Sequence, residues 1–200
     1  GSLKFVSGMS LTRTGDILFS GGGSVTIDSG GLTLPGRLYL SKTGTNSLTL
    51  DSDLTINGNT VEVGASCNFV ANAKKITIRA NGYAFLRGAW TGSKALYDFE
   101  YKPVTGAATN GLYLMGDIEV SNNLILDSNS TDARYRLLIT SNSRGTACTI
   151  TAASVTASYC DFEDITGSGS ASWDLSAATG GSGDCGGNSG ITFTTPATVY

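Results

Sequence analysis

The chain has 200 residues, of which 40% are hydrophobic and only 14% charged, with a net charge of −3 and no histidine. The lack of a basic surplus argues against nucleic acid as a partner, and the lack of histidine excludes Ser-His-Asp and Cys-His catalysis. No apolar run approaches the roughly 20 residues that cross a bilayer, so no membrane span is predicted. The 27 glycines, together with frequent Ser, Thr and Asn, predict many turns and short strands rather than helices.

Short strands are predicted by a repeated pattern in which two apolar residues flank one other residue. The stretch LTLDSDLTINGNTVEVG (48–64) contains this pattern three times, with threonine in the middle of two of them. Side chains alternate between the two sides of a strand, so each flanking pair is expected to point into a core. Up to residue 85 the predicted inward pairs are Val25/Ile27, Leu32/Leu34, Leu38/Leu40, Leu48/Leu50, Leu54/Ile56, Val61/Val63, Cys67/Phe69, Ile76/Ile78 and Tyr83/Phe85.

The spacing of these pairs predicts the fold. The interval from Val25 to Leu48, the third pair further on, is 23 positions. The corresponding intervals from Leu32 to Leu54 and from Leu38 to Val61 are 22 and 23 positions. Three short strands therefore recur about every 22 residues, which predicts an all-β fold: a single parallel β-helix, right-handed by default, with outward threonine ladders. A β-sandwich would also contain many short strands, but it would not keep this interval.

From residue 97 onward the pattern continues with wider corners, and insertions are predicted at 102–111, 127–134 and 164–190. We expect residues 1–200 to form one β-helix domain that is a fragment of a longer chain. About nine turns, stacked about 4.8 Å apart, would form a rod. The later predicted inward pairs are Tyr97/Phe99, Leu112/Leu114, Ile118/Val120, Leu124/Leu126, Leu137/Ile139, Cys148/Ile150, Cys160/Phe162, Trp173/Leu175 and Ile191/Phe193.

Three segments carry a resemblance to a known kind of protein. They are FSGGGSVTIDSGGLTL (19–34), DARYRLLITSNSRGTACTITAASVTASYCDFEDITGSG (132–169) and GDCGGNSGITF (183–193). They resemble low-complexity β-helix regions of large bacteriophage virion and tail proteins and of bacterial surface proteins. The resemblance implies a location outside the cell, on a virion or on a bacterial surface, and implies no particular activity.

Two acidic pairs are candidate catalytic groups. In YDFEY (97–101) and CDFED (160–164) the phenylalanine is predicted to point inward, so Asp98/Glu100 and Asp161/Glu163 point outward. Carboxylates two residues apart on a strand lie about 6.5–7 Å from each other, near the separation in an inverting glycosidase. Asp98 and Asp161 are 63 positions apart, close to three turns, so both pairs are expected on one face. The alternative is that these acids only solubilise the surface.

Basic and aromatic residues provide candidate ligand-binding groups. Arg134 and Arg136 alternate with a tyrosine and are expected to share a face, where they could bind acidic sugars by carboxylate contacts. The alternative for these two residues and Arg144 is charge pairing with the acidic strands. Trp90 follows a predicted strand and Tyr113 lies between two inward leucines, so both are expected to be exposed and able to stack on sugar rings.

The glycine-rich segment AATGGSGDCGGNSG (177–190) lacks the lysine and the following helix of a phosphate-binding loop. Asp184 and Asn188, with Asp174, are candidate oxygen ligands for Ca²⁺, although their spacing matches no calcium motif. The alternative is an ordinary corner loop. No other cofactor is predicted.

The four cysteines show no zinc-site spacing. Cys67, Cys148 and Cys160 fall at inward positions and are expected to act as small core residues. A Cys160–Cys185 disulfide is the pairing expected in an oxidising compartment.

Two main functional hypotheses follow. The first is a non-catalytic structural or binding module, a rod that spaces other domains of a longer chain, forms a homotrimer and contacts polysaccharide. The second is a polysaccharide depolymerase that uses the outward carboxylates. A third hypothesis is an ice-binding face, but the threonines are spread over three faces rather than gathered on one.

Overall fold

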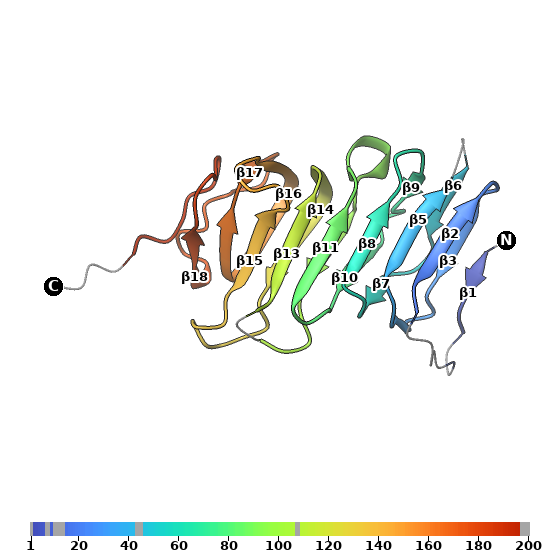
Figure 1. Ribbon diagram of the computed structural model, residues 1–200, viewed down its shortest axis with the longest axis horizontal. Coiled ribbons are helices and arrows are strands. Elements are labelled where there is room, and N and C mark those ends of the chain that lie inside the picture. Colours follow the sequence, from blue (N-terminus) through green and yellow to red (C-terminus); the bar gives the residue numbers. More distant parts are fainter. Residues whose placement is uncertain (1, 7–8, 10–14, 43–45, 107–108, 197–200) are drawn as a thin grey trace.

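The computed structural model describes residues 2–6, 9, 15–42, 46–106 and 109–196. Every strand pairing among them is parallel, and neighbouring strands are about one repeat apart in the sequence. The result is an all-β solenoid of about seven turns with about 23 residues per turn. Figure 1 shows the turns following one another along the long axis, from β1 (Leu3–Lys4) at the N-terminal end to β18 (Thr179–Asp184) at the C-terminal end.

The turns form three faces, which the chain visits in the same order. Two long strands, β14 (Ile118–Asp127) and β16 (Cys148–Glu163), continue across corners from one face to the next. Face 1 contains β2 (Ile17–Gly21), β5 (Leu38–Lys42), β8 (Thr60–Val63), β11 (Tyr83–Arg87), β13 (Gly111–Met115), β15 (Leu137–Ser141), the end of β16 (Cys148–Glu163) and β18 (Thr179–Asp184). Face 2 contains β1 (Leu3–Lys4), β3 (Val25–Asp28), β6 (Ser47–Leu50), β9 (Asn68–Val70), the starts of β14 (Ile118–Asp127) and β16, and β17 (Ile165–Ser168). Face 3 contains β4 (Thr33–Leu34), β7 (Leu54–Ile56), β10 (Lys75–Ile78), β12 (Asp98–Tyr101), the end of β14 and the middle of β16.

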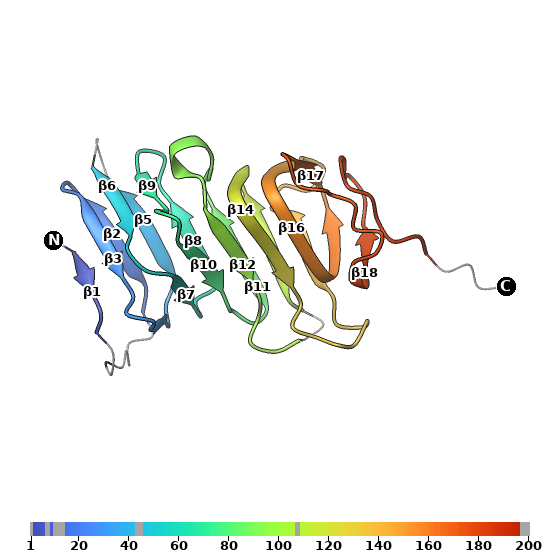
Figure 2. The same cartoon turned by 180° about the vertical axis from the view of Figure 1, so that it is seen from behind.

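The view from behind shows β10, β12, β14 and β16 side by side (Figure 2). Face 2 is interrupted between β9 and β14, where a loop with a short 3₁₀ helix, Gly92–Lys94, replaces a regular strand. No other helix occurs in the described part of the chain, and none of its segments is a helix long and apolar enough to cross a membrane.

The core is a continuous apolar column inside the three faces, as the repeat predicted. Both members of most predicted pairs are buried, and each contributes about 1.5–3 kcal/mol of hydrophobic free energy before entropy losses. The predicted outward ladders also form, because Thr26 pairs with Thr49, and Thr33, Thr55 and Thr77 are in register. The fully confirmed inward pairs are Val25/Ile27, Leu38/Leu40, Leu48/Leu50, Leu54/Ile56, Val61/Val63, Cys67/Phe69, Ile76/Ile78, Leu112/Leu114, Ile118/Val120, Leu124/Leu126, Leu137/Ile139, Cys148/Ile150, Cys160/Phe162 and Trp173/Leu175.

Glycine recurs at the corner between faces 3 and 1 because successive turns approach closely there. A Cβ atom on Gly58 would collide with the carbonyl group of Gly36, and one on Gly36 would collide with that of Gly15. Only glycine lets the backbone of one turn rest directly on the turn below.

One predicted inward pair is wrong. Tyr83 and Phe85 face outward, and their neighbours Ala84 and Leu86 are buried in their place. Val61 therefore pairs with Leu86, 25 positions later, and not with Tyr83. A shift of one residue moves a whole strand's side chains to the other side.

Other sequence expectations need smaller corrections. Leu48 pairs with Phe69 rather than Cys67. The expected nine turns are about seven, because later turns are longer, with Ile118 pairing with Ile150, 32 positions on. The predicted insertion at 164–190 contains β17 and β18, and Tyr97, unlike Phe99, is only half-buried.

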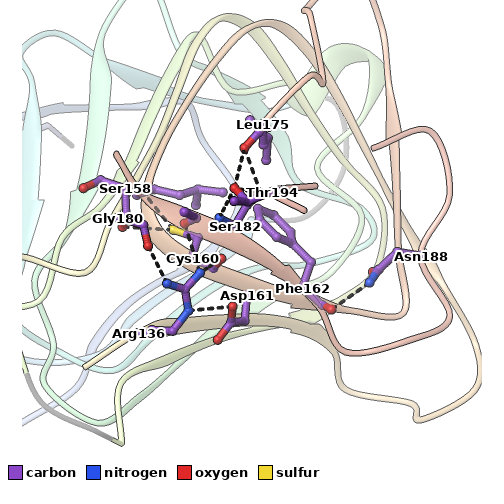
Figure 3. Close-up of polar contacts among 12 residues, drawn as sticks. Arg136, Ser158, Cys160, Asp161, Phe162, Leu175, Gly180, Ser182, Asn188 and Thr194 are labelled. Carbon is purple, nitrogen blue, oxygen red and sulfur yellow. Dashed lines mark hydrogen bonds and ion pairs between the residues drawn. The ribbon is translucent and has the colours of Figure 1, made fainter. Parts of the chain in front are cut away.

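The C-terminal end of the core is closed by polar contacts and a returning segment. Ser182 is buried directly above Cys160. Its hydroxyl donates to the Leu175 carbonyl at 2.8 Å, and its backbone N–H donates to the Thr194 hydroxyl at 2.9 Å. Figure 3 shows Thr194 beside Ser182, and Phe193 packs on Phe162 with ring centroids 5.9 Å apart. The predicted inward residues Ile191 and Phe193 thus lie half-buried against the core without forming a regular strand.

Candidate functional site: an aromatic groove on face 1

Three aromatic side chains meet on the outside of face 1. Tyr83 and Tyr113 pack edge to face with centroids 5.3 Å apart, and Phe85 packs on Tyr113 at 5.4 Å. They come together because Phe85 and Tyr113 are paired in adjacent turns, and Tyr83 precedes Phe85 by two positions. The predicted outward direction of Tyr113 is therefore correct. Tyr83 is 53% exposed, which is unusual for a large aromatic residue in a cluster.

Two members of this cluster, Tyr83 and Tyr113, line a groove of about 370 Å³, which we call the aromatic groove. It is lined by Tyr83, Tyr113, Arg134, Arg136, Leu138 and Asp161, among others. Burial raises the pKa of the Tyr113 phenol, with smaller contributions from Tyr83 and Glu163. The hydroxyl group therefore stays neutral at neutral pH, and the groove offers aromatic faces beside charged hydrogen-bonding groups.

Arg136 and Asp161 form the floor at one end of the aromatic groove. The Arg136 Nε donates to Asp161 Oδ1 at 2.7 Å, and its terminal nitrogens donate to the carbonyls of Gly180, Cys160 and Gly181 at 2.6, 2.8 and 3.0 Å. Figure 3 shows the guanidinium group between Asp161 and Gly180. This arginine thus ties its own turn to the next two turns of the solenoid.

A second hollow continues beyond this ion pair toward the C-terminal end. It measures about 910 Å³ and shares Arg136 and Asp161 with the aromatic groove. Its lining includes Gly181 and Gly183, and the Asp161 side chain lies against Gly183. The two adjoining hollows make face 1 a long surface depression that runs across successive turns.

The two acidic pairs lie on different faces, so the prediction that they share one face is wrong. Asp98 and Glu100 are on β12 of face 3, whereas Asp161 and Glu163 are at the end of β16 on face 1. The 63 positions between the two aspartates do not span whole turns, because the turns between them differ in length.

Each of these four acids has a partner in the structure. Asp98 accepts hydrogen bonds from the Asn122 and Asn123 side chains at 2.8 and 3.0 Å. Glu100 pairs with Lys75 at 2.9 Å, Asp161 with Arg136, and Glu163 with Arg144 at 3.4 Å. The charge-pairing interpretation is therefore confirmed for Arg136 and Arg144.

Arg134 behaves differently from its neighbour. It lies in a turn, its side chain is 80% exposed, and it pairs with Asp132 two residues away at 2.6 Å rather than with an acidic strand. This contact lowers the pKa of Asp132 to about 2. Arg134 nevertheless reaches the same aromatic groove as Arg136.

Trp90, predicted to be exposed, is fully buried. Its ring packs edge to face on Phe69 at 5.3 Å, and its Nε1–H donates to the Arg87 carbonyl at 3.0 Å. Trp90 makes an isolated parallel bridge with Ile118 on face 2, and its side chain lies in the core. Trp90 is therefore a core residue and is unavailable to a sugar.

The candidate calcium ligands make hydrogen bonds within the last turns of the solenoid. Asn188 donates to the Phe162 carbonyl and to Asp184 Oδ1, both at 2.7 Å, and accepts from the Ile165 N–H. Asp174 accepts from the Ser176 hydroxyl at 2.6 Å. Among the described residues no group of three or more cysteine or acidic side chains could hold a metal ion. Calcium binding here stays a prediction.

The cysteines are four free thiols, three of them buried. The expected core role of Cys67, Cys148 and Cys160 is confirmed, but the expected Cys160–Cys185 disulfide is wrong. Cys160 points into the core opposite Ser182, whereas Cys185, three positions after Ser182, lies exposed on the outside of face 1. Side chains an odd number of positions apart on a strand point to opposite sides.

Thiol labelling checks this arrangement. We expect a thiol reagent to modify one cysteine of the native protein, Cys185, and all four in denaturant. Burial, aided by Asp161, Glu163 and Asp184, raises the pKa of Cys185, so its labelling should be slow at neutral pH and accelerate as the pH rises. Mass spectrometry of native and unfolded samples measures the count. Rapid native labelling of Cys160, whose pKa burial raises to about 12, would contradict the inward assignment.

The alternation pattern does not predict the aromatic groove, because it places Tyr83 and Phe85 in the core. One signal could have corrected this. In YAFLR (83–87) the side chains of Tyr83, Phe85 and Arg87 share one side of the strand, so burying the two aromatic rings would also have buried the arginine. An unpaired charge in an apolar column is far more costly than an exposed aromatic ring.

The parallel strands, the continuous apolar column and the recurring three-faced turn define the chain as a β-solenoid protein. No protein-family model, curated protein or solved structure matches it.

Proposed function

We propose that this chain is a non-catalytic, rod-like β-solenoid module of a virion fibre, a phage tail or a bacterial cell-surface protein, and that it contacts glycans through the aromatic groove. The rod proposal is supported by the stacked turns, whose inward residues form a continuous core. Stability in such a stack accumulates through contacts between neighbouring turns. The virion or surface setting is supported by the sequence resemblance of segments 19–34, 132–169 and 183–193.

The observation that carries the glycan proposal is the exposed aromatic cluster beside paired charged groups. Aromatic rings offer flat apolar surfaces to the C–H faces of sugars, and they lose little conformational entropy on binding. Arg134, Arg136 and Asp161 line the same groove and offer hydrogen bonds to hydroxyl or carboxylate groups. The long depression on face 1 suits a linear polysaccharide better than a compact ligand.

The alternative of a depolymerase that uses Asp161 and Glu163, or Asp98 and Glu100, has less support. Asp161 is joined to Arg136 in a contact that holds three turns together, and Glu163 is paired with Arg144. These contacts give the acids a structural role. The groove beside Asp161 nevertheless makes reducing-end release worth measuring in the binding experiment.

A panel of bacterial surface polysaccharides tests the proposal. We expect at least one to bind, and we expect Tyr83→Ala and Tyr113→Ala each to weaken binding about fivefold to thirtyfold, since each removes a stacking surface contributing about 1–2 kcal/mol. Calorimetry on the intact chain measures the affinities. Leu18→Ala is the matched control, because Leu18 is 60% exposed on the same face but lies three strands away on β2.

The outcomes separate the hypotheses. Binding that survives both tyrosine substitutions would refute the aromatic groove as the site. If no polysaccharide of the panel binds, the glycan contact is refuted and only the structural-rod hypothesis remains. Release of reducing ends that disappears in Asp161→Asn, while that variant keeps its thermal midpoint, would favour the depolymerase.

A further inference from the structure

We propose that a second groove, on face 3, binds an oxyanionic group of the carboxylate or sulfate kind. The groove measures about 400 Å³ and lies over β7, β10 and β12, which Figure 2 shows from outside. Its lining includes Thr55, Lys75, Thr77, Arg79, Glu100 and Lys102. This site is on a different face from the aromatic groove and does not depend on the proposed glycan contact there.

Arg79 is the centre of the proposal. Its Nε atom is buried and has no hydrogen-bond partner. Among the described residues no ion pair or side-chain hydrogen bond involves its guanidinium group. A buried donor without a partner destabilises the protein, and it does so more strongly when the group is charged. A bound acceptor in the groove would remove this cost.

The neighbouring turn places a second cation beside Arg79. Ile78 and Tyr101 are paired in register, so the residues that follow them, Arg79 and Lys102, occupy equivalent outward positions one turn apart. Like charges directly opposite on adjacent strands destabilise a sheet. An anion bound between them would convert this repulsion into attraction.

The acids that line this groove, Asp53 and Glu100, and the neighbouring Asp127 all make other contacts. Asp53 Oδ1 accepts a hydrogen bond from the Lys75 backbone N–H at 2.9 Å. Asp127 pairs with Lys102 at 2.7 Å, and Glu100 pairs with Lys75 at 2.9 Å and accepts from the Thr77 hydroxyl at 3.2 Å. These contacts leave Arg79 as the cation of the groove without a counter-ion. The guanidinium group of Arg79 therefore lines the groove with its hydrogen-bond donors unused.

The donor geometry indicates the ligand class. A guanidinium group matches the paired oxygens of a carboxylate or a sulfate and binds them through two parallel hydrogen bonds. A groove of about 400 Å³ is within the size range of small-ligand sites, so a sugar ring carrying the anionic group could occupy it. The same chemistry would accept a free inorganic anion, and the experiment separates the two sources.

Nuclear magnetic resonance tests the proposal directly on the 20.5 kDa chain. The Nε–H signal of Arg79 is followed while sodium galacturonate, sodium sulfate or neutral galactose is added, with sodium chloride keeping the ionic strength constant. We expect a saturable shift with galacturonate or sulfate and none with galactose. Tighter binding of galacturonate would indicate a sugar acid as the source, and tighter binding of sulfate an inorganic or sulfate-ester group.

Variants establish that Arg79 is responsible. We expect Arg79→Gln to weaken binding at least about tenfold and Arg79→Lys to weaken it less, because lysine keeps the charge but loses the planar fork. Glu100→Gln should tighten binding, since it removes a negative charge and releases Lys75. Arg144→Gln, at a side chain 91% exposed in the turn between β15 and β16, is the control and should bind as the wild type does.

Three results would overturn the proposal. They are the absence of a saturable shift with either anion, an equal response to galactose, and unchanged affinity in Arg79→Gln. The wild-type titration needs no variant, and Arg79→Lys retains the side-chain stem, so a poorly folded Arg79→Gln would not remove the test. Loss of polysaccharide binding at Tyr83 or Tyr113 would leave this result unaffected.

Discussion

Replacing Leu54 with aspartate is expected to unfold the solenoid turns around it. Leu54 is 1% exposed and pairs with the equally buried Ile76 of the next turn. The substitution removes apolar contacts and places a carboxylate in a column without polar partners, which should cost at least about 4 kcal/mol. Because each turn is stabilised by its neighbours, the loss should spread to β4 and β10. Chemical denaturation followed by circular dichroism, with hydrogen exchange on these strands, measures the effect.

Thr55→Asp is the matched control for this substitution. Thr55 is the next residue along β7 but faces outward into the groove that contains Lys75. We expect its free energy of unfolding to change by less than about 0.5 kcal/mol. A Leu54→Asp protein that melts cooperatively at the wild-type midpoint would contradict the inward assignment, and with it the mapping of all outward residues.

Removing Arg136 is expected to loosen the C-terminal turns. Its guanidinium group donates to Asp161 and to three backbone carbonyls from two neighbouring turns, and both side chains of the ion pair are less than a quarter exposed. Arg136→Ala leaves these acceptors without their donor, which should cost about 2–4 kcal/mol. We expect faster hydrogen exchange in β18 and a lower thermal midpoint. The thermal midpoint of Arg136→Lys should lie between those of the wild type and Arg136→Ala, since one ammonium group cannot reach all four acceptors.

Arg134→Ala provides the comparison within the same segment. Arg134 is two residues away, and its side chain is 80% exposed in a local pair with Asp132. An exposed pair of this kind contributes little to stability, so we expect a change of less than about 0.5 kcal/mol. Equal effects of the two alanine substitutions would show that the contacts of Arg136 with the later turns are not important for stability.

Much of the fold could be predicted because its rules are local. A strand alternates its side chains with a period of two residues, and stacked turns must repeat their strands at a nearly constant interval. Leu38, Leu48 and Leu54 obey both rules, and all three are buried. The prediction failed at YAFLR, where apolar residues occupy both sides of the strand and the period alone gives no preference.

The candidate site depends on contacts between turns, and these follow from corner lengths. Paired residues in adjacent turns are 21 positions apart between Ile17 and Leu38 but 32 apart between Ile118 and Ile150. An average repeat could therefore not place Asp98 and Asp161 correctly relative to each other. It also could not bring Tyr113 onto Phe85, 28 positions earlier, or seat Arg136 against the carbonyls of Gly180 and Gly181.

By itself the sequence determined that the chain winds as parallel stacked turns, and which side chains fill most of the interior, because one side of each strand must be buried. Leu86 is an exception. Only the tertiary structure decided what meets on the outside: the aromatic groove, the unpaired Arg79 and the position of Cys185. Outward residues are not constrained by burial. Their neighbours depend on the number of residues in each corner, because corner length sets which residues of adjacent turns are paired.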